Sequence, residues 1–138
     1  IEVTGEPYNA GLGVPGAFLP TVRIGLRRSR PELDDLIAQR VDQMWDQGWV
    51  EEVRQLLERG LGQAPTASRA LGYAQIAAYL AGESDEQTAR DLTTIATKRF
   101  VRRQHSWFDR DSRINWIDLS GHGSQSADVL QHALSVIA

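Results

Sequence analysis

The chain has 138 residues, enough for one domain with a hydrophobic core, and its 41% hydrophobic and 24% charged residues are typical of a globular protein. The absence of cysteine excludes a disulfide framework, a thiol nucleophile and a cysteine metal site. No apolar run approaches the roughly 18 residues that a membrane span requires. We therefore expect a cytoplasmic protein with no membrane partner.

Charge is distributed unevenly along the chain, although the formal net charge is only -3. Residues 32–58 contain eight acidic and two basic side chains, whereas residues 98–113 contain six basic and two acidic ones. One part of the molecule therefore repels polyanions and another part attracts them.

The sequence predicts a mainly α protein with two short β-strands. Residues 1–5 resemble a last helical turn closed by Gly5, and the Gly- and Pro-rich residues 9–20 predict a loop. Strands are expected over 21–28 and 113–119. They pair with each other or with strands outside this chain, because two strands form no independent sheet.

Caps and glycines mark the helices between and after these strands. Pro31 follows a cap at Ser29 or Arg30, and a capping box of Ser84 and Gln87 opens the longest helix. The predicted helices cover residues 31–47, 50–59, 66 or 68 to 81, 84–107 and 126–137, with a turn at 121–125. The expected organisation is a single unit with three parts: a loop and edge strand (1–28), a helical region (29–110) and a strand with a closing helix (111–138).

Arg40 breaks the apolar pattern of the first helix. A stripe of apolar residues passes through position 40; its members are Leu33, Leu36, Ile37, Val41 and Met44. An arginine that faces inward must pair or line a wet cavity, since an unpaired buried charge is costly. Two interpretations stay open: an internal salt bridge or snorkelling stem, and a site for an anion such as phosphate.

The segment 97–108 concentrates cations among aromatic residues. Its basic side chains fall on two faces of the predicted helix: Arg99 and Arg103 on one, and Lys98, Arg102 and His105 on the other. No acidic residue balances them between positions 93 and 108, as a solvated helix would normally provide. This pattern favours contact with phosphates, with Phe100 expected in the core.

Other positions are less informative. Gly72 is placed inside the third helix, which indicates close approach of another backbone or a ligand, with simple packing as the commoner reason. Arg69, Tyr73 and Gln75 beside it are candidate polar contacts. The three histidines lack metal-ligand spacing, and neither a nucleophile elbow nor a phosphate-binding loop occurs. The sequence holds no self-contained catalytic site and no metal ligands of its own.

Five blocks together resemble the C-terminal half of bacterial tRNA dimethylallyltransferases, also called tRNA isopentenyltransferases. They are "IEVTGEP", "AQRVDQMWDQGWVEEVRQLLERG", "SRALGYAQIAAYLAGE", "ATKRFVRRQHSWFDRD" and "INWID", in this order and spacing. The resemblance covers nearly the whole chain. It implies the helical C-terminal part of an α/β transferase of the P-loop type, whose N-terminal half is absent here.

The resemblance also implies a reaction. The family transfers a dimethylallyl group from dimethylallyl diphosphate to N6 of adenosine 37 in the anticodon loop, giving N6-dimethylallyladenosine (i6A). The phosphate loop, the general base and most of the Mg2+ site belong to the absent half. We therefore expect this chain to be inactive alone, the intact enzyme to be monomeric, and the isolated part to self-associate through exposed apolar surface.

Specific residues acquire expected roles from the same resemblance. Arg40 matches an arginine that helps to bind the diphosphate. The tRNA-binding candidates are Lys98, Arg99, Arg102, Arg103, Gln104 and Trp107. Lys98 stands where many members have arginine, so a bidentate contact is not expected there. Arg69, Tyr73 and Gln75 are possible substrate-channel residues.

Two other functions remain open at this stage. The chain could be a stand-alone basic-helix module that binds RNA or DNA without catalysis. It could also be a structural scaffold whose cations pair with its own acidic residues.

Overall fold

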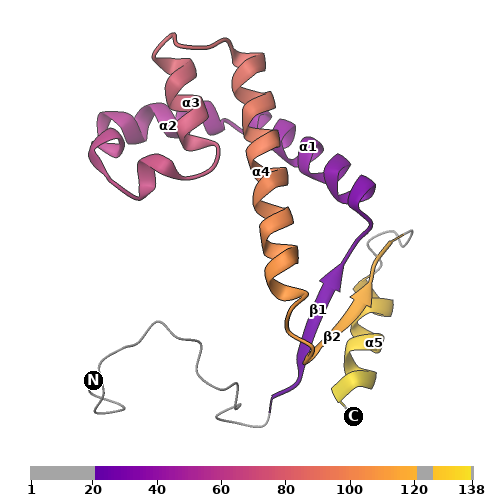
Figure 1. Ribbon diagram of the computed structural model, residues 1–138. Helices are drawn as coiled ribbons and strands as arrows, with labels where there is room; N and C mark the ends of the chain where they lie inside the picture. The colour runs from indigo at the N-terminus through magenta and orange to yellow at the C-terminus, as the bar shows by residue number, and fades with distance from the viewer. Residues whose placement is uncertain (1–20, 121–125, 138) are drawn as a thin grey trace, which may run out of the picture.

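Two short strands pair in parallel, and the chain between them forms a helical region (Figure 1). The computed structural model describes residues 21–120 and 126–137; the predictions for 1–5, 9–20 and 121–125 lie outside them. The elements are β1 (Arg23–Arg27), α1 (Arg30–Asp46), α2 (Trp49–Glu58), the 3-10 turns η1 (Leu61–Gln63) and η2 (Ala67–Arg69), α3 (Tyr73–Leu80), α4 (Glu86–Phe108), β2 (Ile114–Asp118) and α5 (Ser126–Ile137). The mainly helical class and both strands are as predicted.

The core lies where α1, α2, α3 and the first half of α4 meet, at one end of the molecule (Figure 1). Its buried members are Val41, Trp45, Trp49, Val53, Ile76 and Ala89. On α4 the inward residues are small: Ala89 and Thr93 are buried, and the Thr93 hydroxyl donates to the Ala89 carbonyl at 2.8 Å. Small side chains let the neighbouring helices approach α4 closely. None of the described helices is both long and apolar enough to cross a membrane.

Helices α1 and α4 pack in opposite directions. Asp34, early in α1, lies near Lys98 in the second half of α4, whereas Asp42, late in α1, lies 3.4 Å from the guanidinium of Arg90 in the first half. The second half of α4 thereby extends beyond the core toward the strands (Figure 1).

The strands β1 and β2 pair with each other in parallel, with Gly25 opposite Trp116. A Cβ on Gly25 would lie 2.6 Å from the Trp116 ring, so the glycine lets this indole lie across β1. Ile117 is buried, and α5 contacts β2. Of the two pairings considered, the structure shows the mutual one, connected through the whole helical region as parallel strands require.

Two predicted details of the helices are wrong. Gly72 lies before α3 rather than inside a helix: its φ of +86° breaks the segment into η2 and α3. The group that approaches closely is the Trp49 ring, which a Cβ on Gly72 would meet at 1.9 Å. The cap of α4 is Asp85, whose carboxylate accepts from the Thr88 amide at 2.7 Å, and not Ser84. A carboxylate at this position also interacts with the positive end of the helix, which a serine cannot match.

The inward orientation predicted for Arg40 is also wrong, because Arg40 is exposed. The buried residues of α1 are Ile37, Val41 and Trp45, and the centre of this set lies about 100° around the helix from position 40. The predicted stripe omitted Trp45, and its large ring sets the side that packs against the core. Leu36, which shared the predicted stripe, is 43% exposed for the same reason.

Candidate nucleic-acid interface

The second half of α4 carries the basic side chains, and the structure divides them into two sets. In the first set, Lys98 Nζ and Arg102 Nη2 lie 3.9 and 3.8 Å from the same oxygen of Asp34 on α1. His105 belongs with them in part: its Nδ1 is 2.8 Å from Asp109, and its ring stacks on Trp116. These contacts support part of the scaffold interpretation.

The second set has no ion pair with any described acidic residue. It comprises Arg99 and Arg103 on α4 and Arg110 just beyond its end, all exposed. An open hollow of about 340 Å³ is lined by Arg102, Arg103, Ser106, Trp107 and Arg110. Three guanidinium groups around one hollow, with a hydroxyl and an indole, suit a phosphate next to a base or sugar.

Aromatic side chains accompany these cations on the surface. Trp107 is 61% exposed and meets Phe108 edge to face, with ring centroids 4.8 Å apart. Phe100 is 41% exposed and has the Arg103 guanidinium 6.0 Å from its ring centroid, so its predicted place in the core is wrong. The buried core residues of α4, Ala89 and Thr93, all lie before this part of the helix. Exposed rings offer stacking surfaces to unpaired bases.

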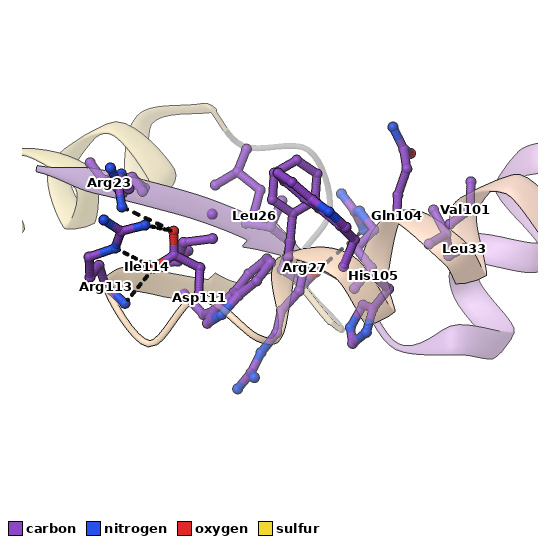
Figure 2. A pocket seen from close by; sticks show the side chains of 17 residues that line it. Arg23, Leu26, Arg27, Leu33, Val101, Gln104, His105, Asp111, Arg113 and Ile114 are labelled. Atoms are coloured by element: carbon purple, nitrogen blue, oxygen red, sulfur yellow. Dashed lines mark hydrogen bonds and ion pairs between the residues drawn. The ribbon is translucent and has the colours of Figure 1, made fainter. Parts of the chain in front are cut away.

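A larger groove of about 880 Å³ lies between the end of α4 and the two strands (Figure 2). Gln104 and His105 line it from α4, and Figure 2 shows their side chains leaving the helix in different directions. Trp107 lines both the groove and the hollow. Gln104 therefore does not join the cations around the hollow, although the sequence placed it in the same segment.

One end of the groove carries an ionic cluster around Asp111 (Figure 2). Its carboxylate accepts from Arg113 Nε at 2.7 Å and from Arg23 Nη1 at 3.0 Å. The hydrogen bonds from Arg113 are the main cause that lowers the pKa of Asp111 to about 2. The cluster links β1 to the loop before β2. Its two arginines, Arg23 and Arg113, pair with Asp111 within the protein.

The block around Gly72 is built into the fold. The Tyr73 hydroxyl donates to Glu52 on α2 at 2.6 Å, and this bond is the main reason that the pKa of Tyr73 is raised. Gln75 Oε1 accepts from the Gly72 amide at 2.9 Å. Arg69 is exposed on η2. None of these three side chains lines the groove or the hollow.

Arg40 stands apart from both sites. It lies exposed on α1, beside the exposed Leu36 one turn earlier, and lines neither the hollow nor the groove. It has no ion pair with a described residue, so the internal salt bridge considered from the sequence is not formed there. An exposed, uncommitted guanidinium stays available to an anion outside this chain.

Metal ligands do not gather in the described part of the chain. Among residues 21–120 and 126–137, no three His, Asp or Glu side chains lie close enough to hold one ion. None of the described residues is therefore assigned to Mg2+.

Sequence reasoning missed Asp34, Ser106 and Arg110. Arg110 could have been found, since the run of basic residues continues past the end of α4. Asp34 could not, because its proximity to Lys98 depends on how α1 crosses α4.

The described residues thus form a helical core and a parallel strand pair that carry an exposed basic helix with surface aromatic rings, a surface of the kind that suits a polyanion. Residues 1–111 match the family model described as IPP transferase, and the chain belongs to this family. It is 51% identical over 137 residues to a tRNA dimethylallyltransferase of Streptomyces avermitilis, covering 99% of this chain, and 55% identical over 117 residues to that of Thermobifida fusca, covering 85%.

Solved structures agree with the family assignment. The full-length tRNA isopentenylpyrophosphate transferase of Bacillus halodurans superposes with a TM-score of 0.74 at 29% identity, over 97% of this chain and 40% of that one. The chain spans 43% of the length of the Streptomyces avermitilis relative and corresponds to the C-terminal part of the relatives it matches. The predicted family and its C-terminal part are thus confirmed.

Proposed function

We propose that this chain is the tRNA-contacting part of a dimethylallyltransferase that acts on adenosine 37 with dimethylallyl diphosphate as the donor, and that it is inactive alone. The observation that carries the proposal is the set of guanidinium groups at Arg99, Arg103 and Arg110, which pair with no described acidic residue. Two of them, Arg103 and Arg110, line the same hollow as the exposed Trp107. Family membership supports dimethylallyl transfer to tRNA, since the relatives are named tRNA dimethylallyltransferase.

In this proposal, α4 binds the backbone of the anticodon stem-loop. The RNA phosphates bind the guanidinium groups that line the hollow, and the rings of Trp107 and Phe108 lie beside unstacked bases. Backbone contacts of this kind offset the energy of extracting one base from the loop. Lys98 and Arg102 contribute after they leave Asp34, and Gln104 borders the groove that the splayed loop would enter.

Arg40 is proposed to bind the diphosphate, since its exposed guanidinium forms no ion pair with a described residue of this chain. Transfer forms a bond between N6 and the isoprenoid carbon that carries the diphosphate, and it breaks the bond from that carbon to the diphosphate oxygen. The proton lost from N6 passes to the general base. Negative charge grows on the departing diphosphate, so a fixed guanidinium would stabilise it most in the transition state.

The test uses the complete enzyme and measures transfer to an anticodon stem-loop containing adenosine 37. Arg40→Ala should lower kcat/KM for transfer by more than about tenfold, or about 1.4 kcal/mol of barrier. Arg54→Ala, an exposed arginine paired with Glu51 on α2, is the matched control and should leave transfer unchanged. Unchanged transfer in Arg40→Ala would remove Arg40 from the site. A folded enzyme that binds RNA but transfers nothing would favour the stand-alone binding module.

A further inference from the structure

Asp34 holds a single negative charge against two positive ones. The same oxygen, Oδ2, lies 3.9 Å from Lys98 Nζ and 3.8 Å from Arg102 Nη2. The side chains of Asp34 and Lys98 are each 27% exposed, and that of Arg102 is 51% exposed. This group of three charges sits between α1 and the basic half of α4.

Neither contact is short enough for a direct hydrogen bond, which needs about 2.7–3.2 Å. Attraction between charges therefore holds the three groups together without a directional bond, and partial exposure weakens it further. An incoming anion can compete for such cations at a low cost.

Arg102 also belongs to the hollow that Arg103 and Arg110 line. Its guanidinium thus borders an internal carboxylate on one side and the candidate phosphate site on the other. While Asp34 is charged, one of the positive charges next to the hollow is compensated within the protein.

We propose that Asp34 is an internal counter-ion that limits how many α4 cations are available to RNA phosphates, and that it acts as a specificity-determining residue for RNA binding. This inference rests on the proposed function. A phosphate that fits the hollow displaces Asp34 from Arg102, whereas a loosely placed polyanion gains less from the cations. Weak attraction to every polyanion is thereby reduced, which is how an opposing charge sharpens discrimination.

The neighbouring Asp35 provides a matched control. It is exposed on α1 and forms no ion pair with a described residue. Asp35→Asn and Asp34→Asn change the net charge equally, but only the second would release Lys98 and Arg102.

The experiment measures binding of a labelled anticodon stem-loop to the complete enzyme over a series of salt concentrations. Asp34→Asn should bind about two- to fivefold more tightly at low salt, the effect of losing one exposed pair. The slope of log affinity against log salt should steepen by about 0.7, the value for one more phosphate on a single strand. Asp35→Asn should match the wild type in slope.

A second background separates charge from structure. When Lys98 and Arg102 are both replaced by Met, adding Asp34→Asn should no longer tighten binding, because the cations it released are gone. Equal or weaker RNA binding by Asp34→Asn, with thermal unfolding unchanged, would overturn the inference. Absence of salt-dependent binding in the wild type would instead overturn the proposed function itself.

Discussion

Gly72 shows how one residue decides the path of the chain. Its φ is +86°, and the Trp49 ring lies 1.9 Å from the place that a Cβ would occupy, so there is no room for any side chain. The residue stops the segment before α3 and lets α2 pack against it, with Trp49 and Tyr73 meeting edge to face at 5.8 Å.

Gly72→Ala should therefore lower the free energy of unfolding by roughly 2–5 kcal/mol, from backbone strain and overpacking together. Gly82→Ala is the control, since Gly82 also has a positive φ, +77°, but no atom lies within 4 Å of the added carbon. It should lose only about 1 kcal/mol. Urea unfolding of both variants measures the difference, and equal losses would show that Trp49 yields without cost.

At the scale of elements, Arg90 links two helices through three contacts. Its guanidinium donates to Glu86 on α4 at 2.7 Å and to Asp42 on α1 at 3.4 Å, and it lies 5.2 Å from the centroid of the Trp45 ring. A planar guanidinium can serve all three, whereas an ammonium cannot.

Arg90→Lys should reduce the free energy of unfolding by about 1 kcal/mol, because the stacking on Trp45 and one of the two ion pairs are lost. Arg54→Lys changes an exposed pair within α2 and should stay within about 0.5 kcal/mol of the wild type. Thermal unfolding of the two variants compares them. A loss no larger in Arg90→Lys than in Arg54→Lys would mean that packing alone sets the α1–α4 crossing.

The elements themselves follow largely from local sequence. Pro31 and the glycines at 48, 60 and 82 mark helix ends within a residue or two of those observed, because caps act on the adjacent turn. What local pattern could not supply was orientation. Trp45 rotated the buried face of α1 away from Arg40, and the proximity of Asp34 to Lys98 arises from a crossing between distant segments.

The candidate site divides in the same way. The sequence located the basic segment, since six basic residues against two acidic ones need no tertiary information. It also placed Arg99 and Arg103 on a different face from Lys98 and Arg102, but only the position of α1 decides which face has an acidic partner.

At the scale of the whole molecule, stability should be concentrated at one end. The helical core contains fully buried side chains such as Val53 and Ile76, whereas β1 and β2 form a two-stranded pair with Leu26 56% exposed. A pair of strands is marginally stable by itself, and parallel strands are normally covered on both faces. The strand end should therefore open locally before the helical core does.

Two backbone hydrogen bonds of nearly equal length test this difference. The Leu119 amide donates to Arg27 at 2.8 Å beside the strands, and the Ile76 amide donates to Gly72 at 2.9 Å in the core. In this 138-residue chain the Leu119 amide should exchange with solvent deuterium at least about tenfold faster, since it is released by local opening rather than by unfolding of the core. Equal exchange of both amides in this chain would show that the strands unfold together with the helices. The helical core would then be sufficient to keep β1 and β2 paired.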